Sequence, residues 1–313
     1  MSVTVVGVGE ALFDVFEDGS ERLGGAPLNF TVHAAQLLGN RGGGESCAMV
    51  SRVGQDEKGR RVVQELASRG VVTRYIQSDA DHLTGIARVF SKPRENGDEF
   101  EIVRDAAWDF LEPAVELDEL AASCKVLCFG TLGCRREANR EAIEGMVSRA
   151  TKAIRLFDVN LRQEYYDISV LRRGCAMATA LKINQRELAV LADLLKLRGN
   201  RDGDYMLALF DRFPLEQIML TRGEQGCVIY AGTARFEGAK PVSYPDSPEG
   251  KDAVGAGDAA AAAFAVGLYT GMPLGDVLEL ANRTGAWVAS RKGGTPELPE
   301  EIRALVPVAT TAA

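Results

Sequence analysis

The sequence contains few of the side chains that bind transition metals. Only two histidines, His33 and His82, occur among 313 residues, and the six cysteines include no Cys-x-x-Cys pair. A zinc site therefore has little support, because such sites gather Cys and His at short spacings. Isolated cysteines in a chain of this composition are more typical of buried, reduced thiols.

Positive charge is also scarce. The chain has 36 Lys and Arg against 44 Asp and Glu, a formal net charge of −8, and contains no basic block. Nucleic-acid affinity depends on clustered Lys and Arg, so this charge balance argues against a nucleic-acid partner. An acidic protein that binds an anionic ligand must collect positive potential locally, from helix N-termini, single Arg side chains or metal ions.

No apolar run approaches the roughly 20 residues of a membrane span. The N-terminus, Met1 to Val6, lacks the basic segment and long apolar core of a secretory signal. Hydrophobic residues make up 46% and charged residues 26%, which is the balance of a globular protein. We therefore expect a cytoplasmic protein without a membrane partner.

Strand and helix patterns alternate along most of the chain. Residues 3 to 8 form a β-branched run that predicts a buried strand, and residues 27 to 38 show helical periodicity that Gly39 ends. From Lys125 onward, short apolar runs alternate with amphipathic segments. This order predicts right-handed βαβ units and an α/β fold, with a mainly parallel central sheet between two layers of helices.

Two segments depart from this alternation. Residues 84 to 90 and 100 to 103 have strand patterns on either side of a polar loop at 92–98. Together with the irregular stretch 11–23, they predict a small sheet that stands apart from the main one. We interpret it as a β lid over a site beyond the carboxyl ends of the parallel strands, where ligands bind in such sheets.

The sequence Gly255-Ala256-Gly257-Asp258 lies directly before the alanine run 259–263, which has the highest helix propensity. Small residues let the backbone approach an anion, and the first N–H groups of a helix stabilise it. Asp258 alone would be consistent with an ordinary N-cap. However, a second carboxylate, Asp252, precedes it where a cation could be held. A carboxylate beside an anion hole suits deprotonation of an alcohol that attacks phosphorus.

At these residues the chain resembles the ribokinase-like, or PfkB, carbohydrate kinases, and the resemblance covers nearly its whole length. The family's D-T-x-G-A-G-D signature reads Asp-Ala-Val-Gly-Ala-Gly-Asp at 252–258, with Ala253 in place of the usual Thr. The resemblance implies that Asp258 is the general base. It also suggests a monovalent cation, such as potassium, at Asp252. The implied anion hole consists of Gly255, Ala256 and Gly257.

The N-terminal part carries a second signature of the family. A Gly-Gly pair followed by Asn stands here as Gly-Gly-Ala-Pro-Leu-Asn at 24–29, and an earlier Asp of the family matches Asp14. Taken alone, Gly-Gly-Ala-Pro would be a turn before a helix. The resemblance implies that sugar hydroxyls are bound by Asp14, Gly24, Gly25 and Asn29.

Three further matches concern the nucleotide. Asn184-Gln185-Arg186-Glu187 resembles the family's N-x-x-E, which implies a nucleotide contact at Asn184 and magnesium held through water by Glu187. Residues 221–226 resemble the T-x-G-x-x-G nucleotide loop, and Asn282 matches an Asn near the adenine. Without the family, these would be a solvated helix start, a hairpin turn and a surface residue. In the loop at 221–226, the resemblance implies that Thr221, Gly223 and Gly226 bind the nucleotide.

The substrate is indicated by more detailed matches. The motif at 24–29, the segment around Arg104 and Asp-Val-Asn-Leu-Arg at 158–162 are most similar to fructokinases, although Val159 stands where Pro is usual. We expect Arg104 and Arg162 to contact the sugar, against the alternative of surface ion pairs. Arg also reads phosphate and carboxylate groups, so another sugar, a sugar phosphate, 2-keto-3-deoxygluconate or a nucleoside stays open.

The resemblance thus implies an ATP-dependent sugar kinase, with fructose as the expected substrate and with ATP and Mg²⁺ as cofactors. The main nucleotide-binding domain would comprise 1–10, 35–83 and 106–313. The lid and sugar-binding segments would be 11–34 and 84–105. An exposed strand edge on the lid also predicts a homodimer.

Two other classes of protein fit parts of the sequence. Val6-Gly7-Val8-Gly9 hints at a Rossmann dinucleotide fold, but Leu12 stands where the third glycine is needed and no helix pattern begins there. A family member that binds sugar or nucleotide as a non-catalytic sensor is the stronger alternative. The intact Asp258 and anion hole argue against it.

Overall fold

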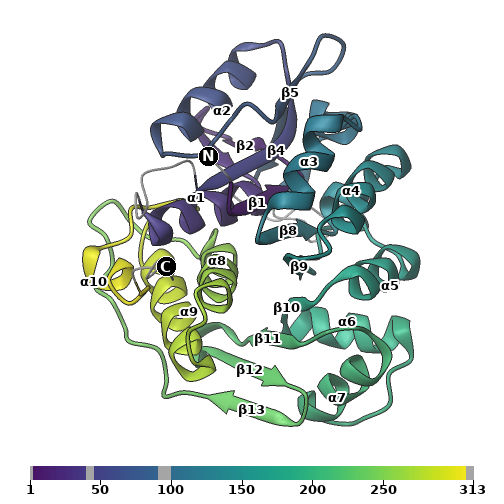
Figure 1. Ribbon diagram of the computed structural model, residues 1–313. Coiled ribbons are helices and arrows are strands. Elements are labelled where there is room, and N and C mark those ends of the chain that lie inside the picture. Colours follow the sequence, from purple (N-terminus) through teal and green to yellow (C-terminus); the bar gives the residue numbers. More distant parts are fainter. Residues whose placement is uncertain (1–2, 40–45, 91–99, 308–313) are drawn as a thin grey trace, which may run out of the picture.

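The computed structural model describes residues 3–39, 46–90 and 100–307, and its strands form two sheets (Figure 1). The large sheet contains β1 (Val5–Val8), β4 (Cys47–Gly54), β5 (Ile76–Asp79), β8 (Val126–Gly130), β9 (Ile154–Asp158), β10 (Ala180–Asn184), β11 (Gln217–Thr221), β12 (Cys227–Ala231) and β13 (Ala234–Glu237). Their order is β13-β12-β11-β10-β9-β8-β1-β4-β5. All neighbouring strands from β5 across the sheet to β11 are parallel. The pairs β11–β12 and β12–β13 are antiparallel. The predicted mainly parallel sheet is confirmed.

Helices cover both faces of this sheet, as expected (Figure 1). One face carries α3 (Val115–Ser123), α4 (Glu137–Arg149), α5 (Ile168–Met177), α6 (Gln185–Leu195) and α7 (Asp202–Arg212). The other carries α1 (Ala26–Leu38), α2 (Glu57–Ser68), α8 (Ala256–Tyr269), α9 (Leu274–Ala289) and α10 (Glu300–Arg303).

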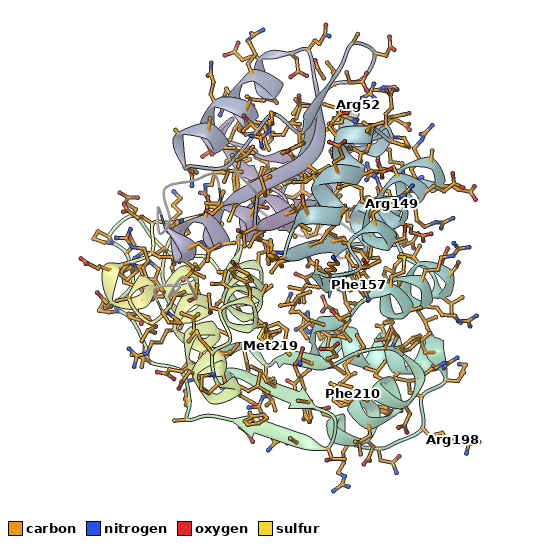
Figure 2. All side chains as sticks on the ribbon, viewed as in Figure 1. Arg52, Arg149, Phe157, Arg198, Phe210 and Met219 are labelled. Atoms are coloured by element: carbon orange, nitrogen blue, oxygen red, sulfur yellow. The ribbon has the colours of Figure 1, made fainter. Side chains whose placement is uncertain are left out.

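The two cores follow from the alternation of side chains along each strand. Phe157 of β9 packs among residues of α4, α5 and α6, whereas its neighbour Leu156 joins the core under α8 and α9. Met219 of β11 belongs to that second core as well, and Figure 2 labels Phe157 and Met219. Because both faces are buried, the central strands have nearly continuous apolar sequences.

The small sheet has the order β3-β2-β6-β7 and consists of β2 (Leu12–Phe16), β3 (Glu21–Gly24), β6 (Gly85–Val89) and β7 (Phe100–Ile102). Strands β6 and β7 match the two predicted strands of the small sheet and are antiparallel, and the loop expected at 92–98 lies outside the described residues. Residues 26–34, assigned to the lid segment from sequence, lie in α1, which packs on the large sheet. The domain division and pairing of two chains through the lid stay predictions.

Several elements have no counterpart in the sequence interpretation, including α3, α7, α10 and the edge strands β5 and β13. These elements are short or lie at the periphery, where the apolar pattern is weak. Short 3₁₀ turns at 107–110, 132–134 and 223–225 were also not expected. All six cysteines are buried and unpaired, as predicted. None of the helices in the described ranges is long and apolar enough to cross a membrane.

Candidate active site

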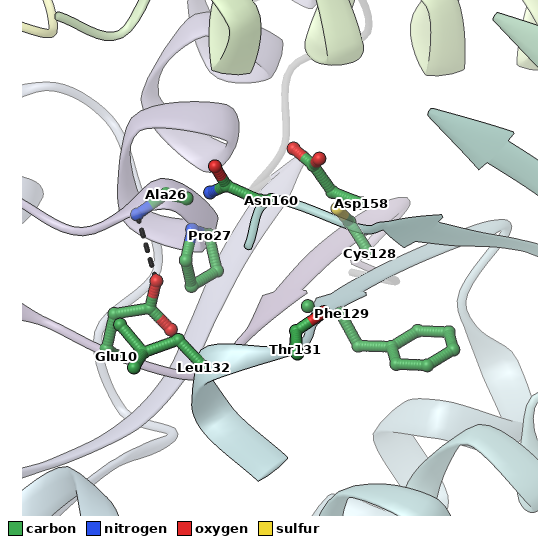
Figure 3. Close-up of a pocket in the computed structure, with 10 residues that line it drawn as sticks. Glu10, Ala26, Pro27, Cys128, Phe129, Thr131, Leu132, Asp158 and Asn160 are labelled. Carbon is green, nitrogen blue, oxygen red and sulfur yellow. Dashed lines mark hydrogen bonds between the residues drawn. The ribbon is translucent and has the colours of Figure 1, made fainter. Parts of the chain in front are cut away.

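The carboxyl ends of the parallel strands bring polar side chains to one edge of the large sheet. Asp158, Asn184 and Thr221 end three neighbouring strands, β9, β10 and β11. Glu10 and Asn160, which follow β1 and β9, line a cleft together with Asp158 (Figure 3). Because parallel strands end at the same edge, residues from distant parts of the chain meet there.

Helix α8 begins at this edge with a backbone geometry that favours glycine. Its N-cap, Gly255, has a φ of 77°, and a Cβ there would lie 2.3 Å from the carbonyl oxygen of Gly294. Within the described residues, the N–H groups of Gly257 and Asp258 have no acceptor. Together with the helix dipole, these two groups are suited to stabilise an anion, as predicted for the anion hole.

The amide of Asn29 connects the N-terminal motif to this helix. Its Nδ2 donates to Oδ2 of Asp258 over 2.8 Å, although the two residues are 229 positions apart. Asn29 is 3% exposed and Asp258 is 6% exposed. Oδ1 of Asn29 is buried without a partner in the described part of the chain, so it can accept a hydrogen bond from a bound hydroxyl. The structure therefore joins a carboxylate, an anion site and a hydroxyl acceptor.

Lys182 of β10 is a candidate that the sequence interpretation missed. Its Nζ lies 2.9 Å from Oδ1 of Asp158, and both side chains are buried. A Cβ at Gly257 would lie 3.2 Å from the same Nζ, so the ammonium group reaches the first turn of α8. The available signal was a Lys inside an apolar strand, because Lys is almost never fully buried unless it is paired.

The charges around Lys182 are predominantly negative. Burial raises the pKa of Asp158 to about 7, against the lowering effect of Lys182. Burial lowers the pKa of Lys182, but Asp158, Glu187 and Asp258 outweigh it and raise that pKa above its ordinary value. The charges of three carboxyl groups thus act on one ammonium group, and Asp158 is in direct contact with it. This excess of negative charge fits a further cation, such as a hydrated magnesium ion.

Asn184 and Glu187 cap helix α6 together. Oδ1 of Asn184 accepts from the N–H of Glu187 over 2.9 Å, and Oε2 of Glu187 accepts from the N–H of Asn184 over 2.8 Å. Oε1 of Glu187 accepts from the N–H of Leu161 over 3.2 Å. Each carboxylate oxygen keeps acceptor capacity, which suits magnesium held through water. No group of three His, Cys, Asp or Glu side chains within the described ranges could hold a metal directly.

The predicted sugar residues of the N-terminal motif lie around one tight turn. A Cβ at Gly24 would lie 2.9 Å from Oδ2 of Asp14, and a Cβ at Gly25 would lie 2.5 Å from the carbonyl oxygen of Glu10. Oε1 of Glu10 accepts from the N–H of Ala26 over 3.2 Å (Figure 3). Gly25 therefore has no room for a larger side chain, because its close neighbour is backbone, and the structure brings Asp14, Gly24 and Gly25 together.

Comparison with known proteins agrees with this geometry. The profile described as pfkB family carbohydrate kinase matches residues 14–301. The chain belongs to the pfkB family of carbohydrate kinases. Fructokinase-1 of Oryza sativa subsp. japonica is 30% identical over 298 residues, which cover 90% of this chain and 87% of that protein.

Solved structures share the fold of this pfkB kinase, which is ribokinase-like as expected. A double mutant of fructokinase from Vibrio cholerae, with fructose, ADP and potassium ion bound, aligns with a TM-score of 0.79 at 22% identity, covering 97% of this chain and 98% of that chain. Aminoimidazole riboside kinase from Salmonella enterica, complexed with aminoimidazole riboside and an ATP analog, aligns with a TM-score of 0.76 at 22% identity. The alignment covers 97% of this chain and 100% of that chain.

The two predicted arginines of the pfkB kinase lie in different surroundings. Arg104 is exposed, with its guanidinium carbon 5.3 Å from the ring centre of Tyr165. Arg162 is half-buried. Burial raises the pKa of Asp14 to about 6 and that of Glu10 to about 7, while the charge of Arg162 acts to lower both. Neither arginine forms a salt bridge with a residue in the described ranges. The alternative that they are ordinary surface ion pairs is therefore not supported there.

The predicted nucleotide loop of the kinase is the turn between β11 and β12. Gly223 and Gly226 have φ values of 56° and 80°, and a Cβ at Gly226 would lie 2.9 Å from Oδ1 of Asn282. That oxygen accepts from the N–H of Cys227 over 2.8 Å. The hairpin turn expected without the family is present. Asn282, in contrast, is a buried residue of α9 that supports the turn.

Substitution of Glu10 by Gln is expected to change how the stability of this kinase depends on pH. The pKa of Glu10 is raised from 4.5 to about 7 by burial, so the folded protein favours the protonated acid. The resulting stability is present below pH 4.5 and is lost as the pH rises to 7. Glu10→Gln cannot ionise and still accepts from the N–H of Ala26. It should exceed the wild type by up to about 3 kcal/mol above pH 7 and match it in acid.

Urea unfolding at about pH 5 and about pH 8 would measure this difference. The exposed Glu164 provides a control, because Glu164→Gln should leave the pH dependence unchanged. Equal pH dependence of Glu10→Gln and the wild type would contradict the expected cost of ionising Glu10.

Proposed function

We propose that this chain is an ATP-dependent fructokinase, which transfers the γ-phosphoryl group of ATP to a hydroxyl group of fructose. The observation that carries the proposal is the contact of Asn29 with Asp258 beside the free N–H groups of α8. It combines a proton acceptor, a hydroxyl acceptor and an anion site within one buried cluster. Relatives named fructokinase at 30% identity support the choice of sugar.

In the proposed reaction, Asp258 accepts the proton of the attacking hydroxyl. The sugar oxygen then forms its bond to the γ-phosphorus as the bond from that phosphorus to the bridging oxygen of ADP breaks. The N–H groups of Gly257 and Asp258 donate to the phosphoryl oxygens. Lys182 adds a positive charge at the same turn. Asn29 holds the carboxylate of Asp258 with Nδ2 and accepts a second sugar hydroxyl with Oδ1.

The remaining predicted residues would lie on either side of the reacting groups, some toward the nucleotide and others toward the sugar. The turn at 221–226 and Asn282 would bind the nucleotide, and Asn184 and Glu187 would contact the phosphates and the water shell of magnesium. Magnesium supplies positive charge against the phosphate oxygens when bound. Asp14, Gly24, Gly25, Arg104 and Arg162 would surround the sugar.

The charge of the sugar end supports a neutral substrate. The charge of Asp258 acts on both Glu10 and Asp14, as does that of Arg162, while Arg22 acts on Asp14 alone. A sugar phosphate or a keto-deoxy sugar acid would add negative charge to this group of carboxylates, which is unfavourable in a partly buried site. Fructose adds none, and its hydroxyl groups can donate to the carboxylates.

ADP release with ATP and magnesium tests the proposal across fructose, ribose, glucose, fructose phosphates, 2-keto-3-deoxygluconate and adenosine. Selective turnover of fructose is the expected result. Turnover of another member of the panel would keep the reaction and overturn the choice of sugar. ATP binding without turnover of any member would favour a substrate outside the panel or the non-catalytic sensor.

A further inference from the structure

The carboxylate of Asp252, six positions before Asp258, is surrounded by N–H donors. Oδ1 accepts from the backbone N–H groups of Val254 over 3.2 Å and Gly293 over 3.3 Å. Oδ2 accepts from the N–H of Gly293 over 3.1 Å and from Nη1 of Arg22 over 3.0 Å. Three N–H groups therefore share this carboxylate, because the N–H of Gly293 is divided between both oxygens, and they take most of its roughly four lone-pair positions.

This arrangement does not fit a potassium ion at Asp252, which the resemblance to carbohydrate kinases suggests. Potassium would have to compete for a carboxylate that already accepts from three N–H groups, one of them on a charged guanidinium. It would also have to lie close to the positive guanidinium of Arg22. Two neighbouring carbonyl oxygens also have one partner each within the protein, since that of Arg291 accepts from the N–H of Asp252 and that of Gly294 contacts Nε2 of His33.

We propose that the guanidinium of Arg22 serves as the built-in cation of the loop 252–255, so that this kinase needs no free monovalent cation. The inference rests on the proposed kinase function and names Arg22 as a positioning residue. The ion pair holds Asp252 next to Gly293 and thereby orders the turn that leads into Gly255 and the anion site. The catalytic loop receives its positive charge from the protein itself.

The position of Arg22 links this loop to the small sheet. Arg22 lies on β3 directly opposite Asp14 of β2, and its guanidinium carbon lies 4.4 Å from the ring centre of Phe16. Asp14 is one of the predicted sugar residues. Because the ion pair with Asp252 forms only when Arg22 is close by, the conformation of the loop before α8 depends on the position of the small sheet. A free ion would not provide this dependence, because it could bind whatever the position of the sheet.

The test compares potassium with tetramethylammonium at equal ionic strength. Wild-type turnover of the accepted sugar should be the same in both salts. Arg22→Met keeps roughly the length of the side chain but removes its charge. Its kcat in tetramethylammonium should fall by about 10- to 100-fold, because a small displacement of catalytic groups lowers the rate by that factor. Potassium should recover most of that loss. Arg22→Lys should keep activity and show no response to potassium.

A second readout does not need turnover. Potassium should raise the thermal unfolding midpoint of Arg22→Met but not that of the wild type, because a bound ion stabilises the folded state. Arg88→Met, on β6 of the same sheet, is the matched control and should behave like the wild type. Potassium stimulation of the wild type, or an Arg22→Met variant that is fully active and indifferent to potassium, would overturn the assignment. If no sugar is turned over, the proposed function fails while the unfolding midpoints still decide the role of Arg22.

Discussion

Replacing Asp258 by Asn should lower kcat by about 10²- to 10⁴-fold, which is the usual contribution of a general base. The substitution removes the proton acceptor but keeps the shape of the side chain. Its amide oxygen can still accept from Nδ2 of Asn29, so the contact between α1 and α8 should persist. The N–H groups of the first turn are unchanged. The fold and the affinity for ATP should therefore remain close to those of the wild type.

Steady-state kinetics, calorimetric titration with ATP and thermal unfolding would together test this expectation. The chain offers a matched control in Asp276, an exposed Asp in the first turn of the neighbouring helix α9. Asp276→Asn also removes an acidic group from a helix N-terminus, but it should retain full activity. If Asp258→Asn kept nearly full activity, Asp258 would be only an acidic residue of the first turn of α8 and not the base.

The sequence indicated the parts of this site better than the contacts between them. Asp258 and Asn29 each lie in a short motif of small residues, whose turn and helix-start chemistry is local and therefore readable from sequence. Their hydrogen bond joins residues 229 positions apart. Strand and helix periodicity cannot specify such a contact, because it depends on which helices become neighbours across the large sheet.

Two residues that matter here were missed for different reasons. Lys182 lies on a strand whose other residues are mostly apolar, so its charge was detectable but its partner Asp158 was not. Arg22 lies in the irregular stretch 11–23, where glycine and acidic residues obscure the pattern of β2 and β3. Its partner, Asp252, lies 230 positions away. The small sheet and its ion pair follow from tertiary packing, which overrides weak local preference.

Replacing Lys182 by Met should have the second large effect, and it should act on both activity and stability. The ammonium group reaches the first turn of α8, where the phosphoryl group would be transferred. Its removal is expected to lower kcat by about 10²- to 10³-fold, the usual effect of losing one such stabilising group. It also leaves Asp158 buried without its partner, which should destabilise the fold by about 3 to 5 kcal/mol.

A double substitution separates these two effects. In Lys182→Met with Asp158→Asn, both charges are absent, so no unpaired carboxylate remains and urea unfolding should show most of the stability restored. The phosphoryl group would still lack its positive neighbour, so kcat should stay low. Recovery of both stability and kcat in the double variant would mean that Lys182 only neutralises Asp158. Recovery of stability alone, with the single variant Asp158→Asn retaining most of its kcat, would assign the ammonium group to phosphoryl transfer, because loss of the carboxylate could not then explain the remaining loss of rate.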